Sequence, residues 1–170
     1  LIVVVGVSVS ESQYIRFPPQ GFTLMWYERV AGSSAYLDAA LLSLKIAALV
    51  TVSATVVGGL AAVAIHRRTL PGAELLATFF LSPLVLPTII YAIGMLMLWS
   101  ALFGAVTLVA LWIAHTVIAM PYVVRTTLAV LSESDPHLEE AARTMGATRL
   151  QRLLYVVLPQ CLPGLVAGAF

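Results

Sequence analysis

Long apolar stretches alternate with short polar segments along this chain. Three of the stretches, residues 37–65, 75–103 and 105–131, are each long enough to extend about 40 Å as a helix, at a rise of about 1.5 Å per residue. A helix needs roughly 20 apolar residues to cross the hydrocarbon core of a bilayer. The pattern therefore predicts three complete membrane spans.

Shorter apolar stretches stand at the two ends of the sequence. Residues 1–9 are too few to cross a bilayer, and we interpret them as the end of a first span whose beginning is missing. A short buried strand is the alternative for these residues. Residues 161–170 are interpreted as the start of a next span. We therefore expect residues 1–170 to form a single transmembrane domain, a fragment that lacks the start of its first span and its C-terminal spans.

The first polar connection, residues 10–36, carries both a chain breaker and an amphipathic segment. The run from Phe17 to Pro19 interrupts regular structure. Trp26 and Tyr27 follow, and these two residue types favour the boundary between membrane and water. We expect a short interfacial helix at residues 24–31, with a structural role rather than a ligand-binding one.

Basic residues predict which side of the membrane each connection occupies. Arg67 and Arg68 follow the first complete span, and Arg149 and Arg152 lie beyond the third. Lys and Arg near span ends favour the cytoplasm. With three complete spans, both basic groups fall on one side, so residues 132–160 are expected to be cytoplasmic and the long first connection external.

Small residues and prolines mark the interiors of the spans. Gly58 and Gly59, with two alanines after them, give the first complete span a face for close helix contact. Pro83 and Pro87 stand in the middle of the second span, where each removes a backbone donor and bends the helix. Bent helices at membrane depth line cavities, because water or protein must satisfy the freed backbone groups.

Composition excludes several classes of function. Hydrophobic residues make up 61% of the chain and charged residues 10%, whereas soluble domains carry about 25% charged residues. A net charge of +1 gives no basis for binding nucleic acid. One cysteine and three scattered histidines form neither a metal-ligand cluster nor a catalytic group. We expect a lipid-embedded protein without a catalytic or metal site.

Residues 132–160 carry the start and stop signals of two helices rather than those of a linker. Asp135 and Pro136 mark the N-terminus of the first helix. Gly146 ends it in the left-handed conformation, which glycine adopts at least cost. Four residues at positions i, i+3, i+4 and i+7 form its apolar face: Leu138, Ala141, Ala142 and Met145.

The second loop helix begins directly after this turn. Thr148 and Gln151 have the spacing of a capping box. Its apolar stripe consists of four residues: Leu150, Leu153, Leu154 and Val157. Pro159 is expected to end the helix, and Pro163 to open the next span. The loop is thus predicted to form two helices joined by a glycine turn.

Charged and small residues of the first loop helix indicate a docking surface. Glu139 and Arg143 are spaced for an i, i+4 ion pair. Ala141 and Ala142 allow a partner to approach closely, and Glu140 offers it a charge. A loop that merely joins two spans does not require two capped amphipathic helices.

The same loop resembles the EAA loop of binding-protein-dependent ABC permeases. That pattern reads E-A-A, three residues, G, nine residues, I-x-L-P, with Val156 here in place of the usual isoleucine. The matching residues are Glu140, Ala141, Ala142, Gly146, Leu158 and Pro159. Residues 21–23 in the first connection, and Pro83 with Pro87 in the second span, look like the spermidine/putrescine permease branch.

The resemblance implies an all-α polytopic membrane protein with the type I ABC importer permease fold, in a bacterial inner (plasma) membrane. In this family the EAA loop docks into a cleft on a cytoplasmic ATPase subunit, which binds the ATP, so the permease itself carries no cofactor and is not an enzyme. By resemblance, Glu140 would contact the ATPase, Ala141 and Ala142 would pack in its cleft, and Gly146 would make the turn. The expected partners are ATPase subunits, a second identical or related permease, and an external solute-binding protein.

Three residues within the predicted spans are candidates for the solute pathway. His115 lies near the centre of its span, where an ionisable residue is a functional candidate; a neutral histidine bonded to a Ser or Thr of a neighbouring helix is the equal alternative. Tyr91 and Trp112, like Trp99, offer aromatic faces to a cation. Because no complete span carries Asp or Glu near its centre, a polyamine would find no buried carboxylate here. Another small solute, an ion-coupled secondary transporter and a non-transporting scaffold are the alternative functions.

Overall fold

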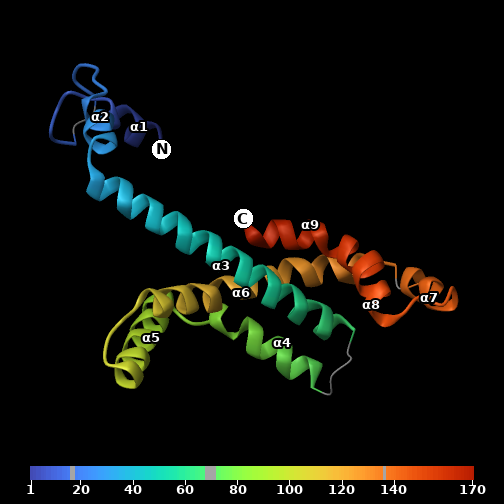
Figure 1. Ribbon diagram of the computed structural model, residues 1–170. Coiled ribbons are helices and arrows are strands. Elements are labelled where there is room, and N and C mark those ends of the chain that lie inside the picture. The colour runs from blue at the N-terminus through green and yellow to red at the C-terminus, as the bar shows by residue number, and fades with distance from the viewer. Residues whose placement is uncertain (16–17, 68–71, 136) are drawn as a thin grey trace. The chain divides into compact units, whose positions relative to one another are not determined.

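The computed structural model describes residues 1–15, 18–67, 72–135 and 137–170, and within these ranges the chain is helical and contains no strand (Figure 1). The all-α fold class is therefore confirmed. The helices are α1 Ile2–Ser8, α2 Met25–Ala31, α3 Ser34–His66, α4 Ala73–Leu81, the 3₁₀ helix η1 Ser82–Leu84, α5 Thr88–Phe103, α6 Leu108–Glu133, α7 His137–Thr144, α8 Arg149–Arg152, the π-helix η2 Leu153–Val157 and α9 Leu158–Ala169. The expectations for Phe17, Arg68 and Pro136 fall outside the described residues.

The chain divides into two compact units, Leu1–Ile46 and Ala47–Phe170. In the first unit, the buried hydroxyl of Ser10 donates to the Gln20 carbonyl at 3.1 Å and accepts from the Gln20 backbone N–H at 3.1 Å. The indole of Trp26, on α2, donates to the Ser10 carbonyl at 2.9 Å. These bonds fold the connection back on itself. Within residues 1–9, for which a strand was the alternative, Ile2–Ser8 form helix α1.

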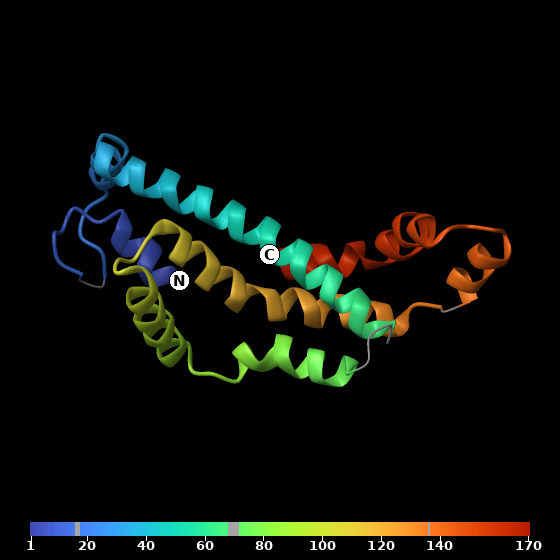
Figure 2. The ribbon, with the colours of Figure 1, turned by 60° about the horizontal axis from the view of Figure 1, so that its bottom comes forward.

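The core of the second unit is the contact between α6 and α9, which lie side by side in both views (Figures 1 and 2). A Cβ atom added at Gly164 would lie 2.8 Å from both the Thr126 carbonyl oxygen and the Thr127 Cα. One added at Gly168 would lie 2.6 Å from the Val123 Cα. The two glycines therefore let the backbones approach more closely than any side chain would permit.

Helix α3 makes its close contacts in the second unit through the predicted small-residue face. Gly58, Gly59, Ala61 and Ala62 are all buried. A Cβ at Gly58 would lie 2.9 Å from Val123 Cβ on α6, and one at Gly59 would lie 2.7 Å from Leu165 on α9. The prediction of a face for close helix contact is confirmed, and its partners are α6 and α9.

The stretch 75–103 is broken rather than bent. Helix α4 with η1, and helix α5, meet at an angle of 100°. Pro83 lies inside the 3₁₀ turn, and Pro87 is the N-cap of α5 with an extended ψ of 125°. Each proline lacks a backbone donor, and Leu86 is driven away from helical geometry because it precedes a proline. Two such defects four residues apart divide the predicted second span into two helical segments.

The second loop helix does not end at Pro159, so that prediction was wrong. Helices α8, η2 and α9 follow one another without interruption from Arg149 to Ala169. The Leu158 backbone N–H bonds to the Leu153 carbonyl, which is the wider i to i−5 pattern of a π-helix. Local π geometry of this kind accommodates a proline in a membrane helix. The loop's second helix therefore continues directly into α9 instead of being separated from it.

Several helices are long and apolar enough to cross a membrane. Among the described residues these are Ser34–His66, Leu108–Glu133 and Arg149–Ala169. The bent pair Ala73–Leu84 and Thr88–Phe103 could supply a fourth crossing or a re-entrant loop. Length and composition thus identify a multi-pass membrane protein.

Candidate functional site

The first loop helix, α7, presents an uncovered apolar face. The Asp135 carboxylate accepts a hydrogen bond from the His137 backbone N–H at 2.9 Å, so Asp135 begins the helix as predicted. Leu138 on α7 is 52% exposed, and Met145, which directly follows the helix, is 87% exposed. An amphipathic helix of eight residues has little stability alone and requires a partner surface for its apolar side.

The turn between the loop helices has the predicted conformation. Gly146 has a φ of +85°, in the left-handed region. Thr148 caps the second helix: its hydroxyl accepts from the Gln151 backbone N–H at 3.3 Å, and the Gln151 side chain accepts from the Thr148 backbone N–H at 2.8 Å. The glycine turn and the capping box are therefore confirmed.

An open groove of about 440 Å³ lies between the two loop helices. Its lining consists of Ala142, Met145, Gly146, Ala147, Gln151, Tyr155 and Val156. Glu140 and Ala141 are exposed on α7 beside it. Leu158 and Pro159 are also exposed, at the start of α9, but do not line the groove. The structure thus brings Ala142 and Gly146 together and leaves the other four residues of the pattern on neighbouring surface.

Glu139 does not pair with Arg143 as predicted. Its carboxylate accepts from Arg67 at 2.8 Å and also lies 3.4 Å from an Arg152 guanidinium nitrogen. Local spacing favoured Arg143. A half-buried carboxylate, however, is stabilised more by two half-buried guanidinium groups than by an exposed one on its own helix. The partner Arg67 lies 72 positions away in the sequence, and no local pattern reveals such a contact.

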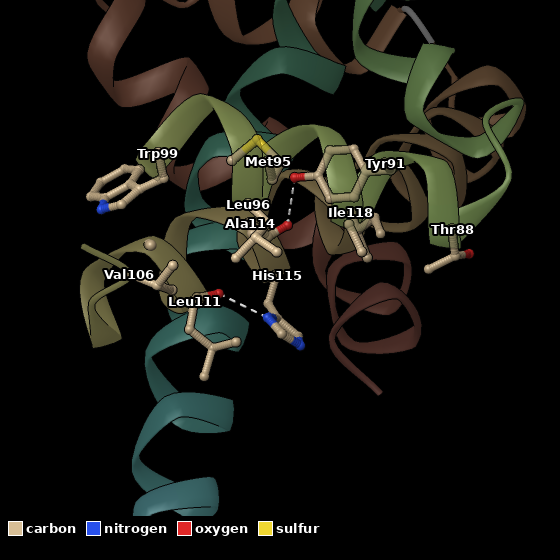
Figure 3. Close-up of a pocket in the computed structure, with 12 residues that line it drawn as sticks. Thr88, Tyr91, Met95, Leu96, Trp99, Val106, Leu111, Ala114, His115 and Ile118 are labelled. Atoms are coloured by element: carbon tan, nitrogen blue, oxygen red, sulfur yellow. Dashed lines mark hydrogen bonds between the residues drawn. The ribbon is translucent and has the colours of Figure 1, made fainter. Parts of the chain in front are cut away.

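A second hollow, of about 420 Å³, lies between α5 and α6 and contains two of the three pathway candidates (Figure 3). The Tyr91 hydroxyl donates to the Ala114 carbonyl at 2.8 Å. His115 Nδ1 lies 2.8 Å from the Leu111 carbonyl of its own helix, rather than against a Ser or Thr of a neighbouring one. Trp112 does not line the hollow, because its indole faces α3 and donates to the Ser53 hydroxyl at 3.1 Å.

The hollow is apolar apart from a few polar edges. Its lining contains no Asp, Glu, Lys or Arg. Besides Tyr91 and His115, Trp99 contributes an aromatic ring whose indole nitrogen is buried and has no hydrogen-bond partner among the described residues. Tyr91, Met95 and Trp99 follow one another at intervals of four residues along α5. All three therefore lie on one side of that helix.

Metal binding finds no support in the geometry of the described ranges. No three side chains of His, Cys, Asp or Glu lie close enough together there to hold an ion. In the loop, His137 Nδ1 lies 3.4 Å from a carboxylate oxygen of Glu140. The arrangement presents an open groove at the loop and an aromatic hollow between two helices.

Comparison with known proteins places the chain in a family. Residues 54–170 match the family described as binding-protein-dependent transport system inner membrane component. The spermidine/putrescine transport system permease protein PotC of Haemophilus influenzae is 30% identical over 99% of this chain and 65% of its own length. The putrescine permease protein PotI of Escherichia coli is 32% identical over 87% of this chain and 55% of its own. The sulfate transport system permease protein CysT of Salmonella typhimurium is 37% identical over 66% of this chain and 45% of its own.

This chain covers 65%, 55% and 45% of the length of these three relatives. The family match over residues 54–170 includes α4 to α9, and so contains both the groove and the hollow. The resemblance drawn from the loop residues is thereby confirmed. The chain belongs to the binding-protein-dependent transport system inner membrane component family, the membrane permeases of ABC transporters.

Proposed function

We propose that this chain forms part of the translocation pathway of an ATP-driven importer, which takes up a small solute delivered by an external binding protein. The observation that carries the proposal is the uncovered groove between two capped loop helices, within the residues matched by the family. Such a surface serves a permease only if a partner occupies it. That partner is a cytoplasmic ATPase, and a second permease subunit completes the pathway in the bacterial inner membrane.

Different residues of the loop would have different roles in contact with the ATPase. Ala142 and Gly146 line the groove and leave room for an ATPase side chain to enter. Glu140 and Ala141 stand exposed beside it, one as a charge and the other as a small contact. Leu158 and Pro159, at the start of α9, would follow the loop's movement into the membrane because the helix continues through them.

Reversing the charge of Glu140 tests this docking. Glu140→Arg in the full-length permease should weaken co-purification of the ATPase by at least about tenfold, because like charges facing each other across an interface cost several kcal/mol. Glu133→Arg is the matched control, since Glu133 is also exposed but ends α6 outside the groove. Equal ATPase recovery with both variants would contradict the docking role of Glu140.

For the solute we propose a polyamine. Two of the relatives are named for spermidine or putrescine transport. The hollow between α5 and α6 offers the faces of Tyr91 and Trp99, and aromatic faces attract organic cations. The sulfate-named relative and the absence of a carboxylate in the lining keep another small solute as the second candidate. Trp112 would act indirectly, by holding α6 against α3.

One polar side chain of the hollow tests whether solute passes through it. His115 lines the hollow together with Tyr91, so His115→Gln should change the rate of spermidine uptake by the complete transporter. His66→Gln, at the exposed end of α3, is the control. An uptake rate in His115→Gln equal to that of the control would remove His115 from the pathway.

A further inference from the structure

One carboxylate joins three helical elements near the base of the loop. The same oxygen of Glu139, Oε1, lies 2.8 Å from Arg67 Nη2 and 3.4 Å from Arg152 Nη1. Arg67 directly follows α3, Glu139 lies on α7 and Arg152 is the last residue of α8. A single side chain therefore connects both loop helices to the end of a membrane span.

The three side chains are partly exposed. Arg67, Glu139 and Arg152 are 23%, 29% and 18% exposed. In the described part of the chain, the Nε atoms of both arginines are buried and have no hydrogen-bond partner. Two guanidinium groups thus share one carboxylate, and neutralising Glu139 would leave two like charges facing each other with only partial screening by water.

The groups around Arg67, Glu139 and Arg152 indicate which helices would move with these three side chains. Beside them lies a small cavity of about 120 Å³ that Val63 and Asp135 also line. Next to it is a cluster of Leu131, Val157 and Cys161, against which Val63 packs. Because α8 continues through η2 into α9, a displacement of Arg152 would also displace α9. The ion pairs of Arg67, Glu139 and Arg152 therefore lie where α3, α6, α9 and the loop meet.

We infer that Glu139 is a positioning residue for energy coupling: it clamps the loop to the end of α3, so that a movement imposed on the loop reaches α3 and α9 together. The inference rests on the proposed function, since it takes an ATPase to be the source of the movement. Partly exposed ion pairs contribute little to folding stability, whereas close glycine contacts hold α6 against α9. Loss of the clamp should accordingly impair coupling more than folding.

The coupling test uses the full-length permease in proteoliposomes with its ATPase and binding protein. The readout is the ratio of ATP hydrolysis with spermidine-loaded binding protein to hydrolysis without it. Glu139→Gln should lower this ratio by about twofold to thirtyfold, the range for residues that carry coupling between sites. Glu133→Gln removes the same charge from the exposed end of α6 and should leave the ratio unchanged. An equal ratio in both variants would overturn the inference.

The arginine partner supplies a rescue that a purely structural role would not show. Arg67 makes one hydrogen bond to Glu139, and a lysine ammonium can also donate one. Arg67→Met should therefore lower the ratio of ATP hydrolysis, whereas Arg67→Lys should keep most of it. Arg143→Met removes an equal charge from exposed surface of α7 and should have no effect. Identical behaviour of Arg67→Lys and Arg67→Met would contradict the clamp.

A second measurement requires neither solute nor ATPase. Backbone hydrogen exchange across residues 137–152 should accelerate in Glu139→Gln and stay unchanged in Glu133→Gln, with the thermal midpoint of both variants close to that of the parent. Unchanged exchange in Glu139→Gln would overturn the clamp whatever the transport result. If the parent protein fails to bind an ATPase, the proposed function fails, while the exchange experiment still decides whether Glu139 holds the loop.

Discussion

Replacing Gly164 with alanine is expected to destabilise the protein by about 1–3 kcal/mol, the usual cost of overpacking a tight contact. The added methyl group would lie 2.8 Å from the Thr126 carbonyl oxygen and the Thr127 Cα. Both are backbone atoms of α6, which cannot rotate away as a side chain can. The Thr126 hydroxyl also donates to the Gly164 carbonyl at 2.7 Å, and this interhelical bond would be stretched when the helices separate.

The measurement is the thermal unfolding midpoint of the purified full-length permease in detergent. Gly94→Ala is the matched control, because Gly94 lies inside α5 with no atom within 4 Å of the added Cβ. There alanine should leave stability unchanged or raise it by up to about 1 kcal/mol, through its higher helix propensity. Gly168→Ala should behave like Gly164→Ala, since its Cβ would lie 2.6 Å from Val123 Cα. Equal midpoints for the Gly164 and Gly94 variants would show that α6 and α9 do not meet as described.

Features set by neighbouring residues were predictable from the sequence. The Gly146 turn, the capping box of Thr148 and the helix start at Asp135 depend on hydrogen bonds within three positions of each other. The small-residue face at Gly58 was also predictable, since a glycine pair inside an apolar helix has few uses other than close packing. Local spacing was therefore sufficient to locate the loop and both of its helix starts.

Features set by distant residues were not predictable. Glu139 has an ideally spaced partner on its own helix, yet it pairs with Arg67 across 72 positions. Trp112 and His115 are three residues apart on α6, but only His115 reaches the hollow, because Trp112 finds a hydroxyl on α3. The direction in which a helix faces its neighbours decides both cases, and a single sequence does not contain that information.

Prolines gave the least predictable backbone geometry. Pro83 and Pro87 divide one apolar stretch at an angle of 100°, whereas Pro121 lies inside α6 and Pro159 inside the run from α8 to α9 without ending either helix. The residue type is the same in each case. What differs is the local geometry: a π-helix precedes Pro159, and the helix continues through that residue.

Gly146→Val is expected to lower coupled uptake by at least about tenfold while leaving the permease in the membrane. Valine strongly resists the φ of +85° found here, because its branched Cβ meets the backbone in the left-handed region. The strain, of order 1–3 kcal/mol, would be relieved by rotating α7 relative to α8. Since Gly146 and Ala142 both line the groove between these helices, that rotation would close or distort the proposed docking surface.

Two further variants separate docking from strain. Gly104 has a φ of +75° at the end of α5, with no atom within 4 Å of an added Cβ. Gly104→Val therefore introduces a comparable strain away from the loop and should retain ATPase binding. Gly146→Asn should retain most of the uptake, because asparagine tolerates the left-handed region better than other residues with a Cβ. ATPase co-purification and spermidine uptake, measured together for all three variants, distinguish loss of docking from backbone strain. Normal coupled uptake in Gly146→Val would show that the loop joins two helices without transmitting force.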